Sequence, residues 1–302
     1  GYVLQFNEPD NRIIPILNIY FLTTLFFAAS IGFIYKTERM SQYPSALQSR
    51  KDLMNLFSTV LPALLIFTIY YMFRLEIVSY FQQMCLDSAT TAGSDAHGYK
   101  VSDFSMFRTI WIHNYSFLFL IALAILNIRK FKNQMLSFVN LGLIALAMLV
   151  FLIEGLYLLS KLREIYLNEL MITQHFNRSL YLAIRYISLG FAISALYYTY
   201  HYIRQQFLKK DFRMDFDILL YISVIWMASS ELINWMDIAD STQSYKLGLS
   251  ILWGCYSLFL ISLGIWKKKK HLRIGAIALF ALTLLKLFIY DISHLDTISK
   301  TI

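Results

Sequence analysis

The sequence predicts an all-α polytopic membrane protein with eight transmembrane helices, arranged as two parallel four-helix repeats. Of its 302 residues, 58% are hydrophobic and only 15% are charged, whereas a soluble domain carries roughly 25% charged residues. The apolar residues form runs of about 20, the length at which an α-helix crosses a bilayer. We expect spans at about 13–35, 53–73, 107–128, 135–159, 179–202, 216–236, 247–266 and 274–293.

Lysine and arginine are unevenly divided between the two sets of connections, which predicts the orientation of the chain. The connections 36–52, 129–133, 203–215 and 267–273 carry 16 of the 27 basic residues, and the opposite side carries 9 over a longer length. We expect the first set to be cytoplasmic and both ends of this segment to be extracytoplasmic. The net charge of +8 follows from this bias and does not indicate nucleic-acid binding. We expect Lys267–Lys270 to contact anionic lipid head groups.

The first four spans place their polar residues toward the predicted outer side. The first span contains no charged residue, and the second ends at Arg74 and Glu76. The third carries His113 and Asn114 in its outer half, and the fourth carries Glu154 in its outer half.

The fifth and sixth spans each carry a polar stripe in their outer halves. Arg178, Tyr181 and Arg185 recur at i, i+3 and i+7, so they share one helix face. Glu231 and Asn234 recur at i and i+3 in the sixth span. The seventh span, by contrast, contains no charged residue.

The eighth span contains Lys286 about 5 Å beyond its midpoint, and Asp291 and His294 lie at its outer end. The Lys286 side chain leans toward the helix N-terminus and therefore toward the bilayer centre. A charge at that depth costs about 2.5–3.5 kcal/mol on insertion scales. We therefore expect Lys286 to contact a carboxylate, with Glu154 or Glu231 ahead of Asp291. On a regular α-helix, Asp291 would point to a different neighbour.

Ionisable residues are almost absent from the inner halves of the spans. Charges with only structural roles would be distributed over both halves of the spans. Their concentration in the outer halves therefore predicts an outward-facing polar cavity. The candidate substrate-binding residues are Lys286, Glu154, Glu231, Asn234, His113, Arg185, Asp291 and His294.

Structural interpretations compete with this one. Lys286 and Glu154 are also interpreted as an ion pair that locks two helices, and Arg185 as a snorkelling side chain. His113 is alternatively a packing hydrogen bonder, and Arg74, Glu76 and Asp237 ordinary interfacial residues. Asp291, His294 and Glu231 together make no dense His/Cys pattern. We therefore expect neither a metal nor a cofactor.

Three ordered matches indicate an internal duplication. "NRIIPIL" at 11–17 matches "NRSLYLA" at 177–183, "YSFLFLIALAI" at 115–125 matches "YSLFLISLGI" at 256–265, and "GLIALAML" at 142–149 matches "GAIALFAL" at 275–282. Because each unit holds four helices, the units 1–168 and 169–302 would be related by an axis along the membrane normal. The chain opens with Gly1 and ends in "SKTI", so we expect it to be part of a longer membrane protein.

The C-terminal run "LLKLFIYDISHLDTISKT" at 284–301, with "SSELINW" at 229–235, resembles a family of bacterial multipass proteins catalogued as domain of unknown function 2339. The residues that match are Lys286, Asp291, Leu295, Asp296 and Lys300. The resemblance is clearest over 229–302. It implies a bacterial envelope membrane, the inner membrane of a Gram-negative cell, and no particular activity.

Three functions follow from these patterns. The first is binding or passing a lipid-linked or envelope small molecule from the outer leaflet. The second is a glycosyl- or acyltransferase that works at the periplasmic face, which needs a general base and an activated donor site. The third is a structural or assembly subunit of a membrane complex, in which polar groups hold helices together.

Overall fold

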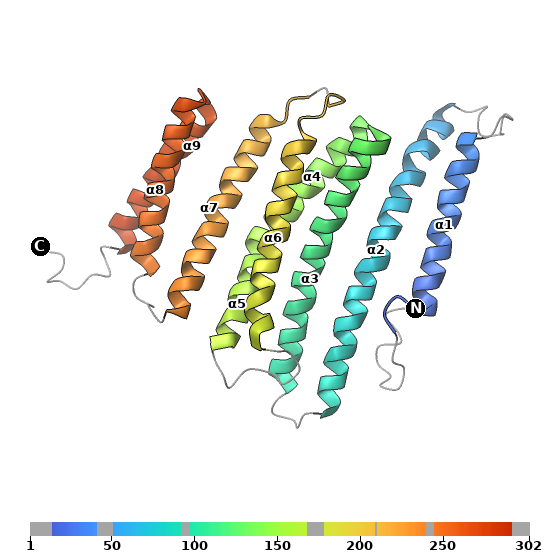
Figure 1. Ribbon diagram of the computed structural model, residues 1–302, viewed down its shortest axis with the longest axis horizontal. Coiled ribbons are helices and arrows are strands. Elements are labelled where there is room, and N and C mark those ends of the chain that lie inside the picture. Colours follow the sequence, from blue (N-terminus) through green and yellow to red (C-terminus); the bar gives the residue numbers. More distant parts are fainter. Residues whose placement is uncertain are drawn as a thin grey trace, which may run out of the picture. The chain divides into compact units, whose positions relative to one another are not determined.

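The computed structural model describes residues 14–40, 51–91, 97–167, 178–208, 210–239 and 245–291. Within these ranges the chain forms helices and no strand (Figure 1). The α-helices are α1 (Ile19–Met40), α2 (Lys51–Thr91), α3 (His97–Leu126), α4 (Gln134–Val150), α5 (Leu156–Leu167), α6 (Arg178–Tyr202), α7 (Arg213–Ile238), α8 (Tyr245–Trp266) and α9 (Lys270–Lys286). The π-helical turns are η2 (Asn127–Phe131), η3 (Phe151–Gly155) and η5 (Leu287–Asp291).

The described residues contain eight helical segments long and apolar enough to cross a membrane, which confirms the predicted all-α membrane fold. In hydrocarbon every backbone N–H and C=O group must be paired within the protein, and a helix achieves this within one segment. The eight segments are Ile19–Thr37, Thr59–Cys85, Asp103–Phe131, Gln134–Leu167, Ser179–Tyr202, Arg213–Ile238, Leu247–Trp266 and Lys270–Ile289.

Some of the helices are longer than the apolar runs that predicted them. The second expected span stops at 73, but α2 contains 41 residues and is therefore about 60 Å long, twice the thickness of a hydrocarbon core. The fourth expected span stops at 159, but α4, η3 and α5 continue to Leu167. Hydropathy detects only the lipid-embedded part, while helical hydrogen bonding continues through charged residues beyond it.

The chain divides into two compact units, Gly1–Tyr115 and Ser116–Ile302. This division differs from the two halves predicted from the sequence matches, 1–168 and 169–302. The internal repeat therefore stays a prediction.

In the first unit, α1 packs along α2. The buried Glu76 carboxylate of α2 accepts hydrogen bonds from the Ile16 backbone N–H at 2.8 Å and from Asn18 Nδ2 at 2.9 Å. Tyr115 of α3 donates its hydroxyl to the Tyr70 carbonyl of α2 at 3.2 Å. The polar group near the end of the second span thus holds the segment that leads into α1, and the interfacial position of Glu76 stays a prediction.

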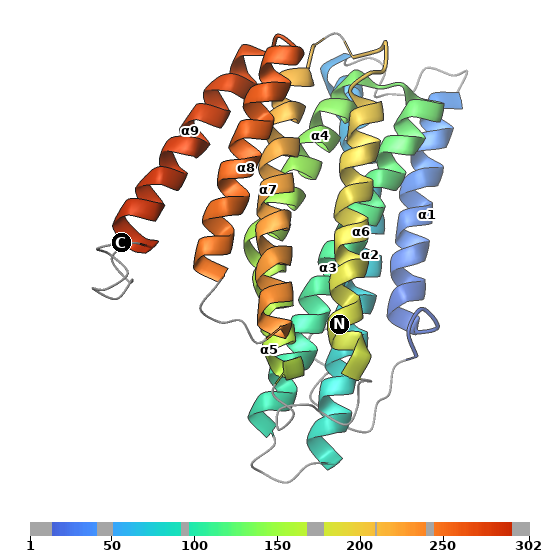
Figure 2. The ribbon, with the colours of Figure 1, turned by 60° about the vertical axis from the view of Figure 1, so that its left-hand side comes forward.

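In the second unit, α5 packs against α6 and α7, and α8 packs closely on α9 (Figure 2). The approach of α8 to α9 depends on Gly264, because a Cβ at that position would meet Arg273 Cγ at 2.7 Å. Asn127 of η2, fully buried, donates through Nδ2 to the Tyr202 hydroxyl at 2.6 Å and to Ser137 Oγ at 2.8 Å. These bonds fix the start of α4 against the end of α6.

Candidate functional site

Helix α7 carries a polar stripe toward α5 and α6. Ser230, Asn234 and Asp237 lie at i, i+4 and i+7, which places them on one face of the helix. Helix α7 packs against both α5 and α6, and Asn234 is fully buried at 0% exposure. The stripe lies in the last three turns of α7, beside the end of α5 and the beginning of α6.

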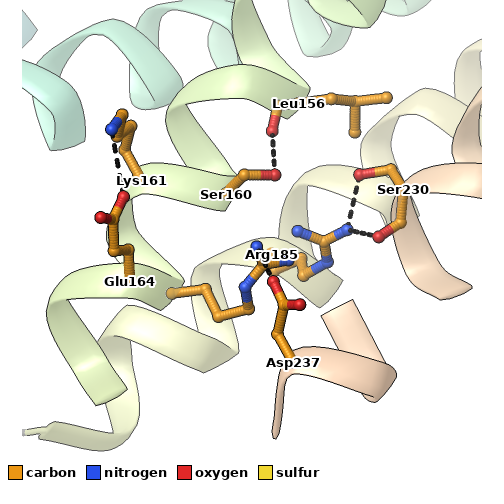
Figure 3. A network of polar contacts seen from close by, with 8 residues as sticks. Leu156, Ser160, Lys161, Glu164, Arg185, Ser230 and Asp237 are labelled. Atoms are coloured by element: carbon orange, nitrogen blue, oxygen red, sulfur yellow. Dashed lines mark hydrogen bonds and ion pairs between the residues drawn. The ribbon is translucent and has the colours of Figure 1, made fainter. Parts of the chain in front are cut away.

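Arg185 extends from α6 to the N-terminal part of this stripe, at Ser230. Its Nε donates to Glu231 Oε1 at 2.5 Å. Its Nη2 donates to the Ser230 hydroxyl at 2.7 Å and to the Ser230 carbonyl at 2.8 Å (Figure 3). Arg185 is 1% exposed. Its interpretation as a snorkelling side chain is therefore wrong, because the guanidinium is buried and pairs with a carboxylate on the neighbouring helix.

Arg163 extends from α5 to the C-terminal part of the stripe, at Asp237. Its Nη2 lies 2.5 Å from Asp237 Oδ2, and the arginine side chain is buried. Figure 3 shows Asp237 and Ser230 approaching the cluster from α7, while Lys161 and Glu164, in the same turn of α5 as Arg163, form an exposed pair with each other. We call the interhelical group the α5–α7 polar cluster; it consists of Arg163, Arg185, Ser230, Glu231, Asn234 and Asp237.

Several buried polar atoms of the α5–α7 polar cluster have no hydrogen-bond partner within the described part of the chain. They are Nε and Nη1 of Arg163, Nη1 of Arg185, and both side-chain amide atoms of Asn234. Buried polar groups in proteins are nearly always hydrogen-bonded, and each exception calls for a physical explanation. The arginines are thus held by carboxylates on one edge while other N–H groups remain available.

The structure brings together three of the residues predicted from sequence, namely Arg185, Glu231 and Asn234. Glu231 accepts from Arg185, whereas Lys286 donates to Ser250 of α8 at 2.7 Å. The predicted contact between Lys286 and a carboxylate stays a prediction.

The other candidates lie apart from these three along the chain. Glu154 occupies the π-helical turn η3 with an exposed side chain. His113 Nδ1 lies 2.8 Å from the Thr109 carbonyl of its own helix. The backbone of Asp291 ends η5, so the regular α-helical spacing assumed between Lys286 and Asp291 is wrong. The Asp291 side chain and all of His294 lie outside the described residues.

Sequence reasoning missed the role of Arg163 and assigned Asp237 to the interface. Arg163 was counted among the basic residues of an outer loop because the apolar run stops before it. A helical signal was nevertheless present, since Leu156, Leu159 and Arg163 recur at i, i+3 and i+7, and all three are buried. Likewise, Asp237 continues the Ser230–Asn234 stripe by one turn.

One lysine of the run Lys267–Lys270, at the start of α9, makes an ion pair with another helix. Lys269 Nζ pairs with the Asp217 carboxylate of α7, which also lies 3.1 Å from His271 Nε2. Lys267, Lys268 and Lys270 are exposed. Their contact with anionic lipid head groups stays a prediction.

The comparisons with known proteins agree with the membrane fold. A family described as "Predicted membrane protein (DUF2339)" matches residues 13–302, nearly the whole chain. No curated protein and no solved structure matches the sequence. With that span of residues matched, the chain belongs to the DUF2339 family of predicted membrane proteins.

Proposed function

We propose that this membrane protein binds or passes a lipid-linked or envelope small molecule at an outward-facing polar site built on α5, α6 and α7. The observation that carries the proposal is the pair of buried arginines in the α5–α7 polar cluster. Arg163 and Arg185 are each anchored by a carboxylate, yet both keep buried N–H groups without a partner among the described residues. The proposed setting is a bacterial inner membrane, with these helix ends facing the periplasm.

Two physical arguments favour a binding role. Ionisable residues inside membrane spans are costly, and they typically mark substrate or ion pathways. A purely structural ion pair stabilises best when its remaining donors are also satisfied, because burying an unpaired donor costs about 1–3 kcal/mol. The side chains of the α5–α7 polar cluster are held in place by ion pairs, but some of their polar atoms lack hydrogen-bond partners among the described residues. This is the arrangement expected of a ligand-binding site without its ligand.

The competing function is that of a structural subunit, and one observation favours it. Each ion pair joins two helices, Arg163 linking α5 to α7 and Arg185 linking α6 to α7. In that case the pairs would act only as interhelical contacts, and apolar residues of similar volume would replace them without loss.

Native mass spectrometry of protein purified from bacterial membranes separates the two functions. The test variant is Arg185→Met/Glu231→Leu, and the matched control is Lys161→Met/Glu164→Leu, which removes an exposed pair on α5. We expect the wild type and the control to retain a small-molecule adduct that the test variant lacks, with the thermal midpoint of unfolding maintained. An adduct that is equal in all three proteins, or absent from the wild type, would contradict the proposal.

A further inference from the structure

We propose that the α5–α7 polar cluster binds an oxyanion, a phosphate or carboxylate group, between Arg163, Arg185 and Asn234. This inference rests on the proposed function and names the chemical class that the same site recognises.

The first argument is the kind of atom left unpaired. Of the five unpartnered buried atoms in the cluster, four are nitrogen donors and one is the Asn234 oxygen. A ligand that satisfies several clustered donors in a small volume must supply many lone pairs. A carboxylate offers about four lone-pair sites and a phosphate offers more, whereas a hydroxyl offers two. A cationic ligand would place its own N–H donors against the N–H donors of the cluster.

The second argument is the placement of those donors. Ser230 and Asp237, the attachment points on α7 for Arg185 and Arg163, are seven residues and about 10 Å apart along the helix. Asn234 lies between them on the same face. The two arginines therefore flank the buried amide from neighbouring helices, α5 and α6.

The third argument concerns how the arginines are held. Glu231 and Ser230 occupy the Nε–Nη2 edge of Arg185, which leaves Nη1 available. Asp237 occupies Nη2 of Arg163, which leaves Nε and Nη1 available. The carboxylates thus fix the plane of each guanidinium in advance, so an incoming oxyanion gains charge-assisted hydrogen bonds without having to order long side chains.

The test compares three probes on the purified chain in detergent micelles. Phosphatidic acid supplies a lipid-borne phosphate and is measured by native mass spectrometry, while inorganic phosphate and acetate are measured by isothermal titration calorimetry. We expect at least one probe to bind, and the probe that binds distinguishes a lipid head group from a free phosphate or carboxylate.

The decisive variant is Asn234→Leu, which removes an unpartnered amide and keeps the branched shape of the side chain. Because no hydrogen bond to a described residue is lost, its unliganded thermal midpoint should equal or exceed that of the wild type. Affinity for the bound probe should fall at least about tenfold, the effect of losing one hydrogen bond to a charged group. The matched control, Ser223→Ala, removes another buried and unpartnered group of α7 and should leave the affinity unchanged.

A second variant keeps the inference testable if Asn234→Leu does not fold. Asn234→Asp has the same size and places a carboxylate beside the proposed oxyanion, so it should abolish binding by charge repulsion. Binding of no probe, or equal binding to the wild type and the position-234 variants, would overturn the oxyanion assignment. If the adduct is still lost in Arg185→Met/Glu231→Leu, the proposed function stands with a ligand of another chemistry.

Discussion

At the residue scale, the Arg185–Glu231 pair should show a large difference between single and double substitution. Glu231→Leu leaves the guanidinium of Arg185, which is 1% exposed, without its carboxylate. Breaking a buried pair in this way costs about 3–5 kcal/mol, so the free energy of unfolding should fall by up to that amount. Arg185→Met/Glu231→Leu should recover most of the loss.

Reversible unfolding of the detergent-solubilised protein, or its thermal midpoint, gives this comparison directly. The side chain of Glu231 is 24% exposed, which places the expected loss toward the lower end of the range. Equal destabilisation by the single and double variants would contradict an energetically coupled pair.

The contact of Lys286 with α8 gives a second residue-scale prediction. Lys286 Nζ donates to the buried Ser250 hydroxyl, so Ser250→Ala should lower the free energy of unfolding by about 1–3 kcal/mol. Ser262→Ala is the control, because its exposed hydroxyl bonds only to the carbonyl of Leu258 in its own helix, and its effect should stay within about 0.5 kcal/mol. Indistinguishable effects would show that the Lys286 contact contributes nothing.

At the element scale, the two predicted halves, 1–168 and 169–302, each contain one tight connection of the same backbone form. Lys132 and Lys268 both adopt left-handed backbone conformations, with φ of 47° and 54°. Each is followed by an extended residue, Asn133 or Lys269, at the N-cap position of the next helix. Such tight connections join the third span to the fourth and the seventh to the eighth.

Two tyrosines provide the element-scale prediction. Tyr115 donates to the Tyr70 carbonyl and Tyr256 donates to the Tyr221 carbonyl, and the sequence matches align Tyr115 with Tyr256. Equivalent positions should respond alike, so Tyr115→Phe and Tyr256→Phe should each cost about 1 kcal/mol. Chemical denaturation of the two variants is the measurement. A loss confined to one of them would count against equivalent roles.

The sequence was sufficient for the helices but only partly for the site. Runs of apolar residues must become helices in a bilayer because the backbone has no other partner, so all eight spans were predictable. Arg185, Glu231 and Asn234 were predictable because each lies inside such a run. Arg163 was not, because hydropathy treats it as a flanking charge; only its contact with Asp237 on another helix gives it a role.

The π-helical turn that follows α9 was also not predictable from the sequence. The expectation for Asp291 assumed 100° per residue, but residues Leu287–Asp291 form a π-helical turn. A π turn depends on how the surrounding helices pack and has no reliable one-sequence signature. Angular arguments across positions 287–291 therefore failed, although the position of the span was correct.

At the scale of the whole molecule, the asymmetry of basic residues predicts the orientation. Ser45→Cys and Asp95→Cys, in a chain without Cys85 and Cys255, place single thiols in connections on opposite predicted sides. A membrane-impermeant thiol reagent applied to intact spheroplasts should label position 95 and not position 45. Labelling of both positions from the same side would contradict the eight-span topology.

The central claim is that the α5–α7 polar cluster is a ligand site. An electron cryomicroscopy map of the protein purified in mild detergent from bacterial membranes tests it most directly. We predict non-protein density in contact with Arg163 Nε or Nη1, Arg185 Nη1 and the Asn234 amide, with both arginine–carboxylate pairs retained. A map in which protein side chains alone close around these nitrogens, and in which Asn234 is hydrogen-bonded within the protein, would contradict the claim.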